Sequence, residues 1–165
     1  MLRFKYCGTH IKDEEYMNRM SKLGYQAKSL VEGFWTFEKD NKIRYTYRVY
    51  YFRGMNKKAI ANKIKDLEKM GIEFVSRYSF WGIFRSKKDF YLYTKEEQLK
   101  VCYKIRKPML IAVIIGPFLI ALFLSLGYLI NKIFLALVVL MTVYYLVCLY
   151  LMIEYTKLIK SLEEK

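Results

Sequence analysis

The sequence predicts an α+β cytoplasmic domain of two β-α-β-β repeats, with an antiparallel sheet and helices on one face, followed by a two-helix transmembrane hairpin. Three observations predict this fold. The stretch GYQAKSLVEGFWTFEKD, residues 24–40, returns 47 positions later as GIEFVSRYSFWGIFRSK, residues 71–87. Residues 109–130 and 133–153 contain no charged residue. Of the 29 Lys and Arg residues, 25 precede residue 108, together with 12 of the 15 Asp and Glu residues.

The first repeat, about residues 1–40, is predicted to be a strand, a helix and two further strands. Apolar residues first alternate with Arg3 and Lys5, which is the period of a half-buried strand, and then recur at helical spacing before Gly24, where a glycine typically ends a helix. These apolar residues are Leu2, Phe4 and Tyr6, then Tyr16, Met17, Met20 and Leu23. Two strands should follow over about 26–31 and 34–39, joined by a turn at Glu32-Gly33.

The second repeat, about residues 42–87, restarts the same order. Residues 43–47 echo residues 2–6, and Asn56 is suited to cap a helix whose apolar face ends before Gly71. A shift of 47 positions aligns Phe37 with Phe84 and Phe34 with Trp81. We therefore expect Phe37 and Phe84 to be equivalent buried positions. Each repeat exposes one apolar helix face and one apolar sheet face, which pairing the repeats can bury.

The C-terminal part is predicted to be a membrane anchor. Domain 1–93 should lead through a connector helix over 94–107 to a hairpin over 108–155, with spans at 108–130 and 133–153 and a tail at 156–165. Each span has the roughly 20 residues that a helix needs to cross a bilayer core. Basic residues flank the hairpin on the side of both termini, and Lys132 alone lies in the opposite loop. The positive-inside bias predicts a multi-pass cell-membrane protein with both termini in the cytoplasm.

Four basic residues are candidate contacts for an anionic surface. The first strand of each repeat contains alternating apolar residues, which are Leu2, Phe4 and Tyr6 in the first repeat and Ile43, Tyr45 and Tyr47 in the second. If these residues point inward, Arg3, Lys5, Arg44 and Arg48 point outward together. Such a cluster could meet anionic lipid headgroups, an acidic protein or nucleic acid. We favour the membrane surface over nucleic acid, because no helix carries a pattern that reads bases. The competing interpretation is an ordinary solvated sheet face.

Trp35 is the second candidate, as a contact for a ligand or partner. Aromatic residues are frequent in both repeats, and most of them fit the core of a small sheet domain. Phe34 aligns with Trp81, so Trp35 should lie on the opposite, outer face, where a large aromatic side chain is available for binding. The full aromatic set is Phe34, Trp35, Phe37, Tyr45, Tyr47, Tyr50, Tyr51, Phe52, Trp81 and Phe84.

The sequence favours a protein that is not an enzyme and has no metal or other cofactor. His10 is the only histidine, and the three cysteines, Cys7, Cys102 and Cys148, form no CxxC pair. No nucleophile with a base, phosphate-binding loop or acid pair appears. Two spans without buried charge offer no transport path, although small residues four apart in the first span are suited to helix packing within the hairpin or in a homo-oligomer.

Several motifs occur in an order that resembles one family. The chain contains EEYMNRMSKLGYQAKSL, FWTFEKDNKIRYTYRVYY and LEKMGIEFVSRYSFWGIFRS, and then two apolar spans. This order resembles the bacterial membrane proteins grouped as domain of unknown function 2812, with Tyr25 where the family often has Trp. The resemblance implies a firmicute-type plasma-membrane protein, often encoded beside PadR-like transcription regulators, and implies no catalytic residue.

The leading hypothesis is therefore a non-enzymatic, membrane-anchored regulatory or interaction module whose partners are the lipid bilayer and a protein such as a PadR-like regulator. The alternative is a membrane-tethered sensor that binds an apolar ligand or drug. An open pocket beside Trp35 would favour the sensor, whereas a filled core would favour the interaction module.

Overall fold

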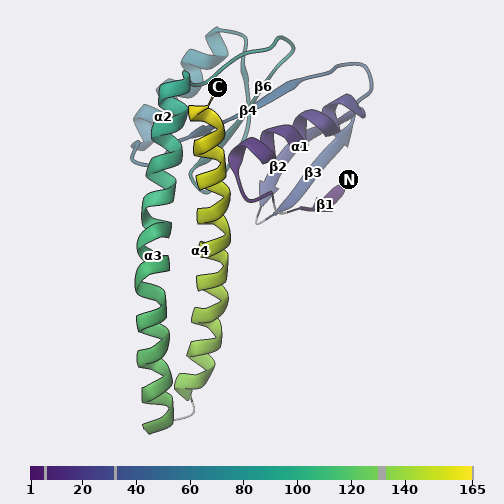
Figure 1. Ribbon diagram of the computed structural model, residues 1–165. Helices are drawn as coiled ribbons and strands as arrows, with labels where there is room; N and C mark the ends of the chain where they lie inside the picture. Colours follow the sequence, from purple (N-terminus) through teal and green to yellow (C-terminus); the bar gives the residue numbers. More distant parts are fainter. Residues whose placement is uncertain (6, 32, 130–132, 165) are drawn as a thin grey trace. The chain divides into compact units, whose positions relative to one another are not determined.

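The computed structural model describes residues 1–5, 7–31, 33–129 and 133–164 (Figure 1). The chain divides into two compact units, Met1–Thr94 and Lys95–Lys165. The expected inward position of Tyr6, the turn residue Glu32 and the Asn131-Lys132 loop lie outside the described residues.

Unit 1 contains two antiparallel three-stranded sheets, each with a helix from its own repeat, which confirms the α+β class. The first sheet has the strand order β1-β3-β2 and the second β4-β6-β5, so the strands form two sheets where one was expected. The first repeat consists of β1 (Leu2–Phe4), α1 (His10–Lys22), β2 (Tyr25–Val31) and β3 (Phe34–Lys39). The second consists of β4 (Thr46–Tyr51), α2 (Lys57–Lys69), β5 (Glu73–Tyr78) and β6 (Trp81–Ser86).

The two repeats correspond at a constant offset of 47 residues. Helices α1 and α2 begin and end 47 positions apart, and so do β3 and β6. The N-caps Thr9 and Asn56 keep the offset, since each side chain accepts a hydrogen bond from a backbone N–H in the first turn. The ladders pair Leu2 with Thr36 and Val49 with Ile83. The structural counterpart of Leu2 is therefore Val49, and the apparent echo between residues 2–6 and 43–47 is misleading.

The core of the first sheet lies on the face that carries Trp35 and Phe37. Both side chains are buried, whereas Phe34 is 47% exposed. Side chains alternate between the faces of a strand, so Trp35 and Phe37 share one face and Phe34 lies on the other. Leu2 and Phe4 pair with Thr36 and Phe34 and are each 66% exposed, so the expectation that they point inward is wrong. The expected equivalence of Phe37 and Phe84 is confirmed, at 2% and 0% exposed.

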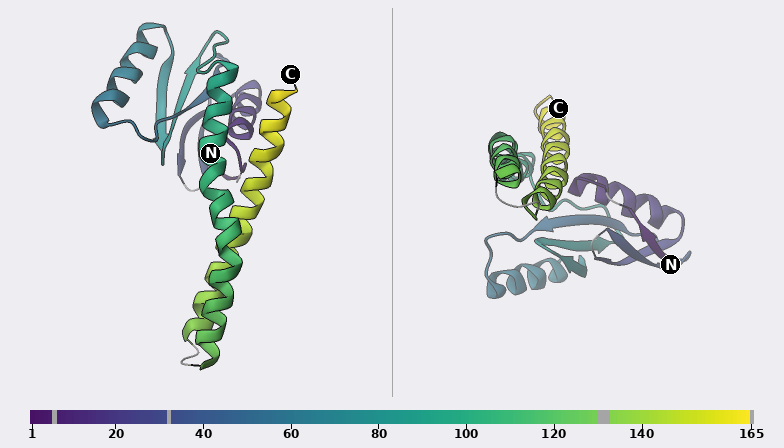
Figure 2. Two further views of the ribbon diagram at one scale, coloured as in Figure 1. Left: turned by 60° about the vertical axis from the view of Figure 1, so that its left-hand side comes forward. Right: turned by 90° about the horizontal axis from the view of Figure 1, so that it is seen from below.

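Helix α1 joins the two sheets, because it contacts both β2 and β4. The core beneath it includes Met17 from α1, Trp35 from the first sheet and Ile83 from the second. Phe84, the next residue along β6, lies in a second core with Ile60 of α2. The second sheet is therefore buried on both faces, and α1 and α2 lie on opposite sides of the strands (Figure 2, right). The expectation that the helices lie on one face therefore holds within each repeat, where one helix covers one face of its sheet, but not for the two repeats together.

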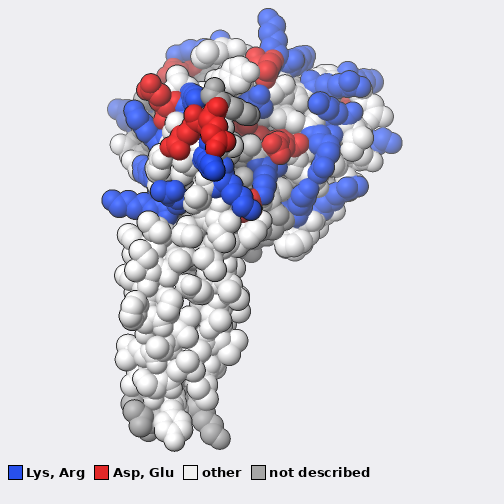
Figure 3. Space-filling view, viewed as in Figure 1, with Lys and Arg blue, Asp and Glu red and all other residues white. Residues whose placement is uncertain are grey.

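Unit 2 is a pair of helices, α3 (Lys95–Leu129) and α4 (Ile133–Glu163). The expected connector and first span form one continuous helix that includes Pro108 and Pro117, and α4 continues through the second span into the expected tail. Both helices are long and apolar enough to cross a membrane. Figure 3 shows long stretches of them without charged residues. The two helices pack against each other at Gly116, where a Cβ atom would lie 2.6 Å from Cδ2 of Tyr145.

Candidate anion-binding cleft

A polar cleft of about 700 Å³ opens in unit 1 beside the second half of α1. Its walls come from three segments: the end of α1, the chain that enters β4, and the chain that leaves β6. The lining residues are Asn18, Ser21, Lys22, Arg44, Tyr45, Thr46, Arg48, Lys87 and Asp89. Four of these are basic and one is acidic, so the cleft carries a net positive charge. Lys and Arg also outnumber Asp and Glu on the face of unit 1 seen in Figure 3.

Buried hydrogen bonds fix the wall that carries Arg44. Gln26 is 3% exposed, and its Nε2 donates to the carbonyl oxygens of Asp40 and Ile43, at 3.2 and 2.8 Å. Its Oε1 accepts from Ser21 Oγ at 3.0 Å and from Tyr47 Oη at 3.2 Å. The backbone of the segment that precedes β4 is therefore fixed by a buried polar network whose hydrogen bonds are satisfied. This network positions Arg44 and leaves the Arg44 side chain available.

Three cations on the cleft have no ion-pair partner among the described residues. Lys22, Arg44 and Lys87 are all exposed, and none takes part in the salt bridges of the described chain. Lys22 lies in the last turn of α1, where a basic residue is favoured by the helix dipole. Arg44 and Lys87 lie on the segments that enter β4 and leave β6. Together they offer three positive charges from three separate chain segments.

Arg48 is held in place by contacts within unit 1. Its guanidinium lies 3.1 Å from Asp89 Oδ1 and 3.8 Å from Glu14 Oε2. Its Nε donates to the carbonyl oxygen of Phe90 at 3.2 Å, and its side chain is only 21% exposed. Arg48 was expected to point outward as a surface contact. Instead it attaches the segment after β6 to α1 and β4, so its main role is structural.

The four predicted basic residues do not form one face. Arg44 and Arg48 line the cleft, whereas Arg3 and Lys5 belong to the β1 end of the first sheet. Arg3 is exposed opposite Trp35, and Lys5 Nζ lies 4.5 Å from the centre of the Tyr16 ring. The physical reason is the constant offset, which makes Arg3 equivalent to Tyr50 and places Arg44 before the start of β4.

Trp35 is fully buried, so its predicted position on the outer face is wrong. Its ring packs against Tyr16 and Phe37, at centroid distances of 5.6 and 6.1 Å, and its Nε1 donates to the carbonyl oxygen of Lys5 at 3.2 Å. The indole therefore fills the core and has a hydrogen-bond partner there. The strand period that places it opposite Phe34 was correct, but the core lies on the Trp35 side.

Two acids on α1 have a role that the sequence did not reveal. Asp13 and Glu14 both attach α1 to the second repeat. Tyr78 Oη donates to Asp13 Oδ2 at 2.9 Å, and the Val49 N–H donates to Glu14 Oε1 at 2.9 Å. Burial raises the pKa of Asp13 to about 6 and that of Glu14 to about 7. No spacing rule could have found them, because their partners are 65 and 35 residues away.

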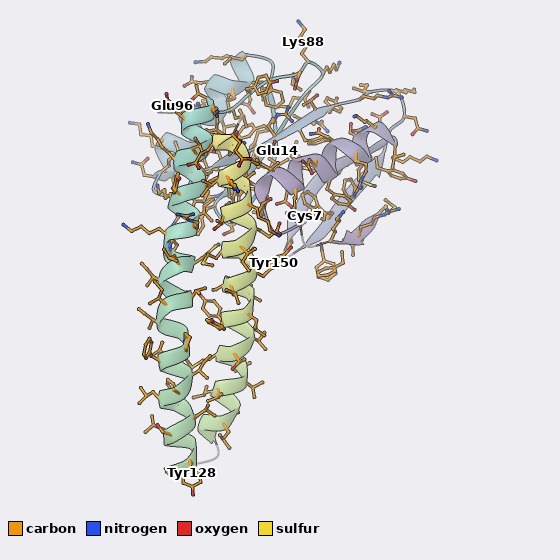
Figure 4. All side chains as sticks on the ribbon, in the orientation of Figure 1. Cys7, Glu14, Lys88, Glu96, Tyr128 and Tyr150 are labelled. Carbon is orange, nitrogen blue, oxygen red and sulfur yellow. The ribbon has the colours of Figure 1, made fainter. Side chains whose placement is uncertain are left out.

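Two further titratable side chains, Cys7 and His10, lie near the start of α1. Burial, followed by the charge of Asp13, raises the pKa of the Cys7 thiol to about 12, so the thiol remains protonated and is a poor nucleophile (Cys7 and Glu14 are labelled in Figure 4). Burial lowers the pKa of His10 to about 4, and its ring stacks on Trp81 at 4.8 Å. Among the described residues, no group of three or more His, Cys, Asp or Glu side chains is placed to hold a metal ion.

The arrangement can therefore bind charge. Three exposed cations around a polar cleft attract an anion and can exchange their water for its oxygen atoms. Two of them are lysines, which act as point charges, and Arg44 adds a planar guanidinium that can contact two oxygens of one phosphate or carboxylate.

A comparison with protein families gives one match. A profile of the family described as "Protein of unknown function (DUF2812)" matches residues 10–115, which include most of unit 1 and the first part of α3. No curated protein and no solved structure matches the chain.

Proposed function

Since the chain belongs to the DUF2812 family, whose description assigns no activity, we propose from its geometry that it is a non-enzymatic, membrane-anchored interaction module that binds a phosphate-bearing anion at the cleft. The observation that carries this proposal is the set of three cations without an ion-pair partner, Lys22, Arg44 and Lys87, around a cleft of about 700 Å³. A multiply charged anion suits a site that offers three cations from three segments.

Helices α3 and α4 serve as the anchor in this proposal, with unit 1 and both termini on the cytoplasmic side. Their length and apolar character support an anchor, and the flanking basic residues support the orientation. At a cytoplasmic surface the phosphate-bearing group could belong to a lipid headgroup or to a soluble molecule. The shared chemistry is a phosphate that carries at least two negative charges.

A regulatory role follows if a protein partner responds to occupancy of the cleft. The family resemblance suggests a PadR-like regulator as that partner, and copurification from native membranes would identify it. The alternative function, a sensor of an apolar compound at Trp35, is not supported, because the Trp35 side chain lies in a filled core.

The proposal is tested with the full chain in nanodiscs of neutral phosphatidylcholine, titrated with pyrophosphate and followed by thermophoresis. The variant Lys22→Gln/Arg44→Gln/Lys87→Gln should lose binding. The matched control Lys57→Gln/Lys58→Gln/Lys65→Gln removes the same charge from exposed positions on α2 and should keep it. Raising the salt to about 1 M, where the Debye length falls to about 3 Å, should weaken binding by the native chain.

Nanodiscs that contain an anionic phospholipid distinguish the two sources of phosphate. If a lipid headgroup is the ligand, the native chain should bind pyrophosphate more weakly in anionic nanodiscs than in neutral ones. If the ligand is a soluble molecule, the native chain should bind pyrophosphate equally in both kinds of nanodisc. Equal loss of binding in the cleft variant and the α2 control would mean that net charge alone attracts the anion, and the cleft would not be its site.

A further inference from the structure

Side chains accept hydrogen bonds from the backbone N–H groups along the free edge of β4. This strand lies at the end of its sheet, so alternate backbone N–H groups point away from β6. Those of Tyr45, Tyr47 and Val49 donate to Ser21 Oγ, Asn18 Oδ1 and Glu14 Oε1, at 2.9, 2.7 and 2.9 Å. The N–H of Tyr51 donates to Tyr93 Oη. A stripe of polar residues at positions 14, 18 and 21 of α1 thus closes this edge against further strands.

The free edge of β1, which is equivalent by the 47-residue offset, has no such cap. Residues 1 and 5 bond to β3, because the Phe37 N–H donates to the Met1 carbonyl and the Lys5 N–H to the Gly33 carbonyl. Leu2 and Phe4 therefore direct their N–H and C=O groups away from the sheet. Among the described residues nothing hydrogen-bonds to these groups, whereas their counterparts Val49 and Tyr51 are capped.

The apolar faces of the two sheets differ in the same way. Val49 is fully buried beneath α1 in the second sheet, but its counterpart Leu2 is 66% exposed. The exposed face of the first sheet consists of Leu2, Phe4, Val31 and Phe34, each at least 47% exposed. The first sheet thus combines an open hydrogen-bonding edge with an uncovered apolar face.

The charges on β1 indicate which partner fits. Arg3 and Lys5 alternate with Leu2 and Phe4, so an added strand would place every second side chain opposite a cation. A second copy of β1 is a poor partner. Antiparallel pairing of Phe4 with Leu2 or with Phe4 of the other copy places Arg3 opposite Arg3 or Lys5 of that copy, and like charges directly opposite each other are destabilising. Helix α2 of another copy is equally unsuited to cap the edge. It carries Ala61, Lys65 and Glu68 at the positions of Glu14, Asn18 and Ser21.

We propose that the β1 edge binds an extended segment of a partner protein in which apolar and acidic residues alternate. Its backbone pairs with Leu2 and Phe4, its apolar side chains continue the exposed face of the first sheet, and its carboxylates lie opposite Arg3 and Lys5. This is strand addition, in which the backbone gives affinity and alternate side chains give specificity. The site is separate from the cleft at Arg44.

The test measures the binding of labelled peptides to the full chain in neutral nanodiscs by fluorescence anisotropy. One peptide alternates Val and Glu over six residues, and the other alternates Val and Lys. The native chain should bind the Val-Glu peptide and not the Val-Lys peptide. The variant Phe4→Pro removes an outward N–H that β3 does not use, and proline is tolerated at such edge positions. It should bind about tenfold more weakly than Phe4→Ala, which loses the same ring but keeps the N–H.

Reversal of one charge provides a variant that does not depend on the effect of proline on folding. Arg3→Glu should reduce binding of the Val-Glu peptide and allow the Val-Lys peptide to bind, whereas Lys57→Glu on α2 should change neither. Equal affinity of Phe4→Pro and Phe4→Ala would overturn the proposal, as would equal binding of the two peptides. Binding of anionic vesicles that the Val-Glu peptide does not displace would assign this face to the membrane instead.

Discussion

Asp13 and Glu14 connect the two repeats through hydrogen bonds made at buried positions, and this makes unit 1 sensitive to pH. Each folded-state pKa is raised, to about 6 and about 7, so the buried carboxyl groups favour the protonated form. A raised carboxyl pKa adds stability below the unfolded value, near pH 4, and that stability is lost as the pH rises through the folded value. The charged forms are therefore the ones that folding disfavours.

The free energy of unfolding of unit 1 should decrease between about pH 4 and about pH 8, by at most roughly 3 kcal/mol for each acid. Asp13→Asn and Glu14→Gln should each flatten this dependence, since neither amide titrates and Gln keeps an oxygen for the Val49 N–H. Pulse proteolysis of the detergent-solubilised chain at several pH values measures the effect. Glu15→Gln, at an exposed neighbour, is the control, and a profile that stays unchanged in Glu14→Gln would refute the role of that residue.

Phe34 and Phe37 on one strand provide a test of which face is the core. Phe37→Ala and Phe84→Ala should each lower the free energy of unfolding by about 3–5 kcal/mol, the usual cost of truncating a buried Phe. Phe34→Ala should cost far less, because that ring is 47% exposed. Urea-dependent proteolysis of the full chain compares the three variants. Similar losses in Phe34→Ala and Phe37→Ala would contradict the assignment of the core to the face of β3 that carries Trp35 and Phe37.

At this scale the sequence predicted burial well where a side chain has a repeat partner of the same kind, as Phe37 has in Phe84. It misplaced Trp35, because the period of a strand separates two faces without saying which one is covered. The cover comes from α1 and is settled only by packing. The cleft cations could not be grouped from sequence either, because Lys22, Arg44 and Lys87 meet only when three segments come together.

At the scale of elements, α1 differs from α2 by serving two sheets. It carries Glu14, Asn18 and Ser21 along one side, and these residues replace a neighbouring strand for the edge of β4. Helix α2 lacks this stripe, and among the described residues its core partners lie on its own sheet and in the segment that follows β6. The two repeats thus share the same backbone structure at a constant offset, but their helices carry different side chains.

Removing one cap should open the β4 edge locally. Asn18→Ala leaves the Tyr47 N–H without its side-chain acceptor and removes one of the two side-chain donors to the Tyr47 carbonyl oxygen, the other being Arg48. We expect faster hydrogen exchange at Tyr47 and a loss of stability of about 1–3 kcal/mol, the cost of an unsatisfied buried group. Exchange measured by mass spectrometry on fragments of β4 would report it. Asn62→Ala, at an exposed position on α2, should leave exchange in β4 unchanged, and equal effects of the two variants would exclude the capping role.

The boundaries of most elements followed from local signals, such as the N-cap at Asn56 and the glycines that end both helices. The division into two sheets did not, because sheet order depends on which strands pair and the period of a strand is the same in either arrangement. The misleading echo at residues 43–47 has a similar origin. Alternating basic and apolar residues match at many registers, and only the ladder with β6 selects the register that places Val49 beside Ile83.

At the scale of the whole molecule, composition alone predicted two helices that could serve as a membrane anchor. Unit 2 consists of them, and their apolar side chains are largely exposed, as expected of surfaces that face lipid. The continuity of α3 across the expected connector could not be decided from sequence, since Pro108 is compatible with either a helix start or a helix interior.

The orientation of the anchor is the remaining prediction. Of the basic residues near the two spans, only Lys132 lies between them, whereas Lys104, Arg106 and Lys107 precede the first and Lys157 and Lys160 follow the second. The positive-inside bias therefore predicts that unit 1 and both termini are in the cytoplasm. In a background where Cys7, Cys102 and Cys148 are replaced by Ser or Ala, a membrane-impermeant maleimide added to intact cells should label a cysteine at Asn131. It should not label one at Lys42 or Lys165 until the cells are opened. Positions 131 and 165 lie outside the described residues, but Lys42 is exposed in unit 1 and is the decisive site. Labelling at Lys42 in intact cells would place the cleft and the β1 edge outside the cell, away from the cytoplasmic phosphates and proteins that both proposals require.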